Sequence, residues 1–150
     1  MSNNHIMLVL NNSQIDIEKW VQLGLNLAGE SGTLLLRALI LVPEGQSASE
    51  YVTQAQQWRN LLNPFASGHD IVEDDLRIFV DTEPIKRVIE EIQQTGVNRV
   101  LMQWAGPNQR TAGMVTNDLL QTIPADLMLV GREGWANEGP ILLSLKGGPN

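Results

Sequence analysis

The sequence predicts an α/β domain of the doubly wound class. Five short apolar segments alternate along the chain with four segments in which apolar residues recur at helical spacing. The first apolar segment is continuous, as expected of a strand that is buried on both faces of a parallel sheet. Strands that alternate with helices indicate a parallel sheet with right-handed crossovers and helices on both faces.

The composition supports one domain with its own core and argues against two classes of function, nucleic acid binding and thiolate chemistry. The chain has 150 residues, of which 43% are hydrophobic, so neither a disulfide nor a structural metal is needed for folding. Its formal charge is −7 with only ten Lys and Arg residues, so no nucleic acid partner is expected. The absence of cysteine excludes thiolate chemistry and is compatible with the cytoplasm, which is the expected location.

The first predicted strand covers residues 5–11 and is followed by a helix over residues 15–28. Ser13 is the expected N-cap of this helix, because its hydroxyl can accept a hydrogen bond from a free backbone amide of the first turn. Gly29 follows the last apolar residue and is expected to end the helix.

The second predicted strand, residues 33–42, is apolar except for Arg37. Ser47 and Glu50 have the spacing of a capping box, which predicts the start of a second helix. Its apolar positions are Tyr51, Ala55, Trp58 and Leu62. Residues 63–75 are rich in turn formers and charge and are predicted to form a loop.

The third predicted strand, residues 76–80, alternates like a strand near the edge of a sheet. Pro84 suits the first position of a third helix, and Gly96 suits its end. The fourth predicted strand covers residues 99–104.

The remaining elements are a fourth helix over residues 111–122 and a fifth strand over residues 126–131. The regular alternation then stops. We therefore assign residues 1–131 to the α/β domain and residues 132–150 to a tail. The tail contains an extra strand at residues 141–145, expected at the edge of the sheet.

The last third of the chain carries a family resemblance. Residues 113–130 contain a glycine at the expected helix start, a helix, a turn with Pro124 and a final apolar strand, and the first strand ends in the polar triplet Asn11-Asn12-Ser13. With the order of elements, this resembles the universal stress protein family over about residues 5–131. The resemblance implies five parallel strands in the order 3-2-1-4-5.

ATP-binding members of that family carry a glycine-rich loop after the fourth strand, whose amides hold the phosphates. The corresponding span is several residues shorter here and retains Gly106 and Gly113. Met114 stands where the family has a hydroxyl, and Pro107 removes an amide donor. Asn11 replaces the aspartate that would meet the nucleotide base. These departures predict a degenerate nucleotide site and no bound cofactor.

Ligands of open parallel sheets bind at the carboxyl ends of the strands, where the strand order reverses. For the order 3-2-1-4-5 this crevice lies between the first and fourth strands, and its candidate lining residues are Asn11, Asn12, Ser13, Gln103 and Gly106. The alternative is structural: residues 11–13 turn the chain and cap a helix.

Arg110 and Gly113 complete the candidate cleft. Arg110 and Thr111 together would place a guanidinium and a hydroxyl near an anion at a helix N-terminus. The alternative for this pair is a Thr111 N-cap beside a solvated arginine.

No catalytic or metal-binding group is expected. His5 and His69 have no partners at ligand spacing. The acidic pairs at residues 74–75 and 90–91 are interpreted as solvated faces, because adjacent helical residues point in different directions. The chain is therefore not expected to be an enzyme.

Residues 141–150 of the tail look like the opening of a second such domain, as in the tandem stress-protein modules appended to bacterial permeases of the amino-acid and cation-chloride cotransporter type. Residues 104–111 also look more like those appended domains than like free stress proteins. This resemblance implies a regulatory or scaffold domain of a secondary transporter, with a transmembrane domain in the same polypeptide. The alternative is a stand-alone stress protein that binds ATP or AMP. Family dimers pair through the last strand, which predicts a homodimer through Leu127, Met128, Leu129 and Val130.

Overall fold

The structure is a computed structural model that describes residues 5–11, 16–68, 77–104, 110–131 and 142–146. Its elements, in chain order, are β1 (His5–Leu10), α1 (Ile17–Ala28), β2 (Thr33–Leu41), a 3₁₀ turn η1 (Ala48–Tyr51), α2 (Val52–Gly68), β3 (Arg77–Asp81), α3 (Pro84–Thr95), β4 (Arg99–Trp104), β5 (Arg110–Thr111), β6 (Met114–Val115), α4 (Thr116–Thr122), β7 (Asp126–Gly131) and β8 (Leu142–Lys146).

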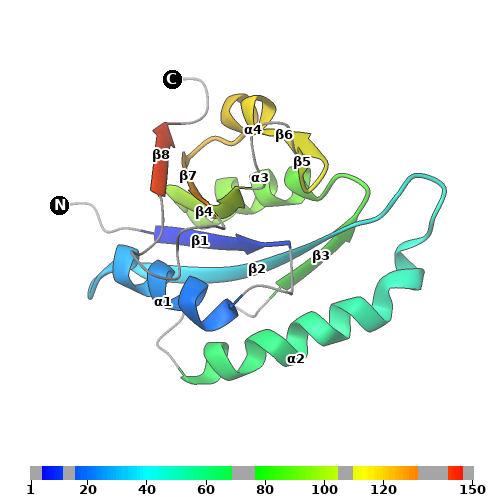
Figure 1. Ribbon diagram of the computed structural model, residues 1–150, viewed down its shortest axis with the longest axis horizontal. Helices are drawn as coiled ribbons and strands as arrows, with labels where there is room; N and C mark the ends of the chain where they lie inside the picture. The colour runs from blue at the N-terminus through cyan, green and yellow to red at the C-terminus, as the bar shows by residue number, and fades with distance from the viewer. Residues whose placement is uncertain (1–4, 12–15, 69–76, 105–109, 132–141, 147–150) are drawn as a thin grey trace.

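One sheet with the order β3-β2-β1-β4-β7-β8 forms the centre of the protein (Figure 1). Its first five strands are parallel and follow the predicted order 3-2-1-4-5, which confirms the doubly wound fold. β8 pairs antiparallel with β7, with Leu143 opposite Leu129, and so forms the extra edge strand. The described strand covers Leu142–Lys146, and Ile141, the predicted first residue, lies outside the described residues.

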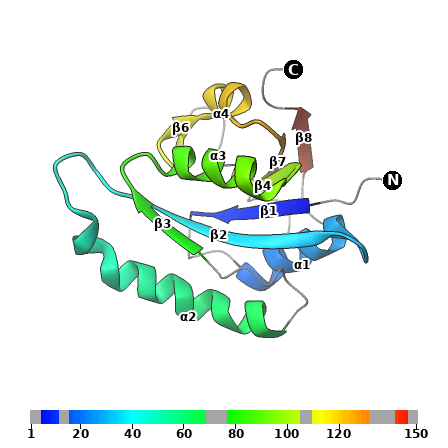
Figure 2. The same ribbon diagram turned by 180° about the vertical axis from the view of Figure 1, so that it is seen from behind.

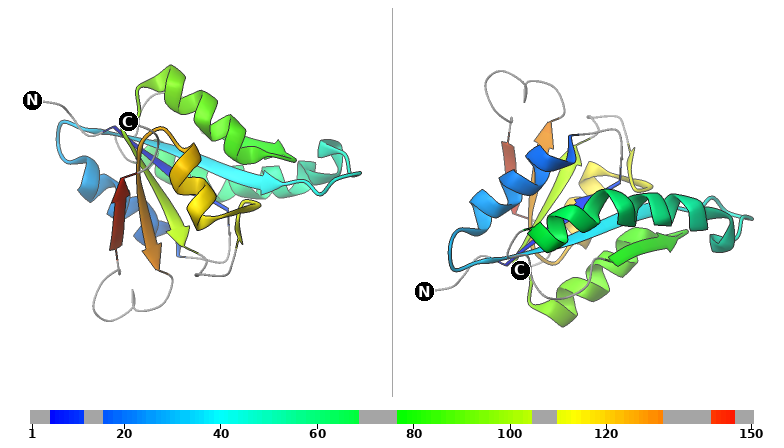
Figure 3. Two further views of the ribbon diagram at one scale, coloured as in Figure 1. Left: turned by 90° about the horizontal axis from the view of Figure 1, so that it is seen from above. Right: turned by 90° about the horizontal axis from the view of Figure 1, so that it is seen from below.

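The central strands alternate between two hydrophobic clusters, one on each face of the sheet. Helices α1 and α2 cover one face, and α3 and α4 cover the other (Figures 1 and 3). Within β1, Ile6, Leu8 and Leu10 contact the first cluster, whereas Met7 and Val9 contact the second. Burial of both faces explains why this strand is apolar throughout.

Helix α1 begins later than predicted. Its N-cap is Asp16, whose carboxylate accepts a hydrogen bond from the backbone N–H of Lys19 at 3.3 Å. The prediction of Ser13 as the N-cap was therefore wrong, and Ser13 itself lies outside the described residues. Serine and aspartate are about equally favoured at the N-cap, so residue type alone could not distinguish Ser13 from Asp16. Gly29 ends the helix with φ 75°, as predicted.

Helix α2 follows the predicted capping box and then continues beyond the predicted end. Ser47 and Glu50 make both hydrogen bonds of the box. The prediction of a loop from residue 63 was wrong, because α2 runs through Pro64 to Gly68. Phe65 continues the apolar stripe after Leu62 and packs against the core. The free energy gained by burying Phe65 therefore exceeds the cost of the backbone hydrogen bond that Pro64 cannot donate.

Helix α3 has the predicted boundaries. Pro84 occupies its first turn, and Gly96 ends it in the left-handed conformation with φ 75° and ψ 18°. Its residues Val88 and Ile92 pack on the sheet from the face that α4 also covers (Figure 2).

The predicted fourth helix, residues 111–122, is only partly correct. Residues 116–122 form α4, whereas residues 110–115 form the antiparallel hairpin β5–β6. This difference changes the candidate site, which lies in the same segment.

Candidate functional site

The carboxyl ends of β1 and β4 lie side by side, as the strand order requires (Figure 1). Asn11 directly follows β1 and is partly buried. Gln103, near the end of β4, is 7% exposed and follows Leu101 on the face that α1 covers. The predicted site residues Asn12, Ser13 and Gly106 lie outside the described residues. Two of the five residues predicted to line this crevice are thus placed at the expected edge.

The hairpin after β4 replaces the first turn of the predicted helix. Arg110 pairs with Val115 and Thr111 with Met114, which leaves Ala112 and Gly113 as a two-residue loop. Both loop residues have positive φ, 51° for Ala112 and 92° for Gly113. Positive φ at both positions defines the tight turn that matches the twist of a two-stranded hairpin.

This hairpin brings Arg110 and Gly113 into contact with each other. Arg110 Nη1 donates a hydrogen bond of 3.1 Å to the carbonyl oxygen of Gly113 across the turn. The helix begins only at Thr116. The predicted helix N-terminus at Arg110 and Thr111 is therefore wrong, as is Thr111 as an N-cap, because both residues lie in β5. The proposed binding of an anion by Arg110 loses this support and stays a prediction.

A pocket of about 220 Å³ lies beside the hairpin and away from the crevice between β1 and β4. It is formed by the first half of α3, the β5–β6 turn and the end of α4. Gly113 is the only predicted site residue among the described residues that line it. The sequence carries no signal for its other residues, because the apolar ones in α3, Ile85 and Ile89, look only like part of the helix side that packs on the core.

The side chains at the start of α3 form local ion pairs. Asp81 Oδ1 accepts a 3.0 Å hydrogen bond from the backbone N–H of Glu83, and this bond is the main reason why the pKa of Asp81 lies below its ordinary value of 3.8. Lys86 Nζ lies 2.9 Å from Glu83 Oε2, and this hydrogen bond raises the pKa of Lys86. Arg87 approaches Asp81 at 3.7 Å and stacks on the ring of Phe79 at 5.1 Å.

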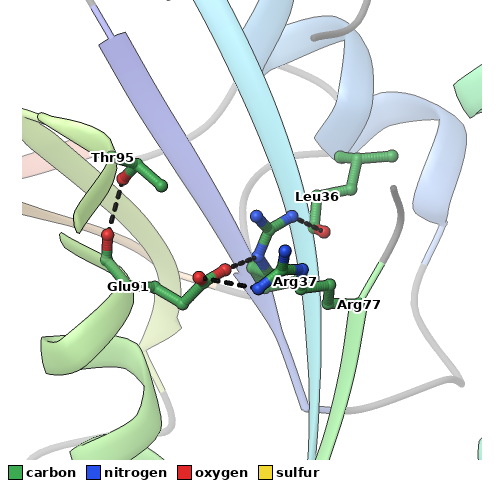
Figure 4. A network of polar contacts seen from close by, with 5 residues as sticks. All are labelled: Leu36, Arg37, Arg77, Glu91 and Thr95. Atoms are coloured by element: carbon green, nitrogen blue, oxygen red, sulfur yellow. Dashed lines mark hydrogen bonds and ion pairs between the residues drawn. The ribbon is translucent and has the colours of Figure 1, made fainter. Parts of the chain in front are cut away.

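A buried ionic cluster lies between α3 and the sheet (Figure 4). Glu91 Oε1 accepts a 2.6 Å hydrogen bond from Arg37 Nε, and Glu91 Oε2 accepts a 3.1 Å hydrogen bond from Arg77 Nη1. Arg37 also donates to the carbonyl oxygen of Leu36 at 2.9 Å. Arg37 is 1% exposed and Glu91 is 5% exposed.

The interpretation of residues 90–91 as a solvated face is therefore wrong for Glu91, although Glu90 is exposed. Glu91 precedes Ile92 and follows Val88 by three positions, so it lies on the buried stripe of α3. The lone charge of Arg37 within an apolar strand was the available signal, because a buried guanidinium requires an acidic partner. Both carboxylate oxygens of Glu91 contact arginines, which favours a structural role over proton transfer.

Within the part of the chain that the structure describes, no three His, Asp or Glu side chains lie close enough together to hold a metal ion. Among the described helices, none has both the length and the hydropathy needed to cross a bilayer. No protein-family model matches this chain, and no curated protein matches it. The stress-protein resemblance therefore remains a prediction that rests on the residues quoted for it.

Proposed function

We propose that this chain is a non-catalytic regulatory or scaffold domain whose nucleotide site is degenerate. The observation that carries the proposal is the hydrogen bond from Arg110 to the carbonyl oxygen of Gly113. It lies within the segment that, by the family resemblance, would cradle phosphates. Residues 110–115 form a hairpin, the guanidinium of Arg110 donates a hydrogen bond within it, and α4 starts only after it.

The proposed setting is the cytoplasmic side of a bacterial secondary transporter of the amino-acid or cation-chloride type. The tail that looks like the opening of another stress-protein module supports this setting. A reading frame that continues past Asn150, or that begins upstream of Met1 with membrane spans, is the expected genomic result. A frame limited to these residues would favour the stand-alone alternative.

The proposed partner contact is a homodimer formed along the β7 side of the sheet. Leu127, Met128, Leu129 and Val130 are buried within the monomer, and β8 pairs with the edge of β7. A second copy would therefore add to the β8 edge, or β8 would exchange between the two chains.

Isothermal titration of the full chain with ATP, ADP and AMP, with and without Mg²⁺, tests the degenerate site. We expect no binding tighter than about 1 mM, which corresponds to about −4 kcal/mol. Micromolar binding would overturn the proposal and support the alternative, a stress protein that binds adenine nucleotide.

Two matched variants locate any nucleotide affinity that is found. Arg110→Ala removes the guanidinium of the hairpin, and Arg59→Ala removes an exposed guanidinium from α2. A nucleotide site at the hairpin would lose affinity only in the first variant. Equal weakening in both variants would instead indicate non-specific attraction of phosphate to positive charge.

A further inference from the structure

The pocket beside the hairpin has a mostly apolar wall. Ile85 is 3% exposed at its base, and Ile89, Ala112 and Met114 are partly buried around it. Leu41 is 44% exposed, and a Cβ atom placed on Gly113 would lie 3.5 Å from its methyl carbons. The apolar surface therefore continues from the hairpin turn to the end of β2.

The charged groups at the pocket mouth compensate one another. Glu83 and Lys86, which both line the pocket, pair at 2.9 Å. The hydroxyl of Thr122, on the opposite side, donates to the carbonyl oxygen of Asp118 at 2.6 Å. A ligand would thus meet no net charge from these residues, which favours an uncharged molecule over an anion or a cation.

The pocket wall contains a residue with an uncommon backbone conformation. Ala112 is the one non-glycine residue with positive φ in the described part of the chain, and it lines the pocket. Alanine rarely adopts this conformation, because its Cβ atom crowds the backbone. Such residues cluster at ligand-binding sites, where the surrounding structure maintains the strain.

The size of the pocket limits the ligand. An apolar cavity of about 150 Å³ accommodates benzene. The volume here, about 220 Å³, therefore suits a molecule somewhat larger than one aromatic ring.

We propose that this pocket is a binding site for a small, uncharged and mostly apolar molecule of about the size of two fused rings. This site goes beyond the proposed function, which concerns the nucleotide crevice and the dimer. Apolar contact with Ile85, Ile89 and Met114 provides the affinity. Thr82, Glu83 and Lys86 make one end of the pocket polar.

Indole is the probe for the test. In ¹H–¹⁵N spectra of the full chain, we expect saturable shifts at Ile85, Ile89, Ala112 and Met114, with a dissociation constant of about 0.1–5 mM, as ligand efficiency allows for so few atoms. Shifts concentrated at Val52 and Leu61, the exposed apolar residues of α2, would overturn the proposal, as would no saturable shift up to the solubility limit.

Two tryptophan variants form a matched pair. Ile89→Trp fills the pocket from α3 and is expected to weaken indole binding at least about tenfold, because the new side chain takes the space that indole would occupy. Leu61→Trp adds the same side chain on α2, where Leu61 is 40% exposed, and is expected to leave binding unchanged. Unchanged binding in Ile89→Trp would contradict the proposed location, and the shift map of the unaltered chain decides the question if that variant does not fold.

The ligand class is tested with charged relatives of the probe. Indole-3-acetate and tryptophan are expected to bind more weakly than indole, because the Glu83–Lys86 pair presents no net charge. Tighter binding of the anion would show that Lys86 recognises a negative charge and would overturn the assignment to uncharged ligands. These outcomes are independent of the nucleotide titration, so the two proposals can fail separately.

Discussion

Glu91 on α3 accepts a 2.6 Å hydrogen bond from Arg37 at the centre of β2, and both residues are almost completely buried. Arg37 is aligned with Arg77 of the neighbouring strand, which contacts the other carboxylate oxygen (Figure 4). One glutamate thus connects a helix to two strands of the sheet. This cluster makes the attachment of α3 depend on charge as well as on apolar packing.

Removing one member of the pair should strongly destabilise the fold. For Glu91→Leu alone we expect a loss of about 3–5 kcal/mol in the free energy of unfolding, because the guanidinium of Arg37 stays buried without the carboxylate. Arg37→Met alone should cost less, because Arg77 still pairs with Glu91. The double variant should recover most of the loss seen in Glu91→Leu, since Arg77 has a side chain that is 49% exposed and can turn to solvent. Urea denaturation of the double-mutant cycle measures these values.

Glu90→Gln is the control for this cycle, because Glu90 is the exposed neighbour of Glu91. It should change the unfolding free energy by less than about 0.5 kcal/mol. A double variant as unstable as the sum of the single variants would show that the pair is not coupled.

Asp81 should make stability depend on pH. Its pKa is lower in the folded protein than the ordinary value of 3.8, mainly because of the hydrogen bond from the N–H of Glu83. The folded state therefore binds fewer protons, and the stabilisation is fully present above the unfolded pKa and is lost as the pH falls through the folded pKa.

At pH 7, Asp81→Ala should reduce the unfolding free energy by about 1 kcal/mol, the typical net contribution of one hydrogen bond. This difference should shrink below about pH 4. Urea denaturation between pH 7 and pH 2.5, with the exposed residue changed in Glu44→Ala as the control, tests the dependence. A difference that stays constant over this range would contradict the role of the Asp81 charge.

Ala112→Asn should stabilise the β5–β6 hairpin. Ala112 has φ 51°, and asparagine followed by glycine is the preferred pair for a two-residue turn of this kind. We expect a gain of about 0.5–1 kcal/mol in thermal or urea unfolding. Gly113→Ala should have the opposite effect, because Gly113 has φ 92°. A loss of stability in Ala112→Asn would mean that the turn differs from this geometry.

Truncation after Gly131 should promote self-association. It removes β8, which pairs with the edge of β7, and therefore exposes the backbone of an apolar strand. Sedimentation equilibrium at several protein concentrations should show a larger dimer fraction for the truncated chain than for the full chain. Loss of a dimer on truncation would instead place the contact on β8.

Much of the fold could be predicted because its signals are local and agree with one another. β1 is apolar throughout and is buried on both faces, and α3 has proline in its first turn and glycine at its end. The alternation of strands and helices then leaves few topologies. Local signals failed where two of them competed, as with Ser13 and Asp16 as N-caps or with Pro64 inside α2.

The candidate site was harder to predict because its features depend on tertiary contacts. Thr111 is of a residue type that often caps a helix, and Ala112-Gly113 lacks the asparagine that normally marks a tight hairpin turn. The helical spacing of the following residues therefore favoured a helix from residue 111. Glu91 beside exposed Glu90 looks like part of a solvated pair until the distance to Arg37 is known. The pocket joins α3 to a hairpin distant in sequence, which no local pattern indicates.

We propose above that residues 110–115, which form the β5–β6 hairpin, do not hold phosphate. The most direct test of this proposal is a titration of the ¹⁵N-labelled full chain with Mg²⁺-ATP, followed at the backbone amides of Gly113, Met114 and Thr116. We expect no saturable shift at these amides below about 1 mM nucleotide. Saturable shifts there at micromolar concentrations would contradict it, because they would show that the hairpin opens to bind the nucleotide.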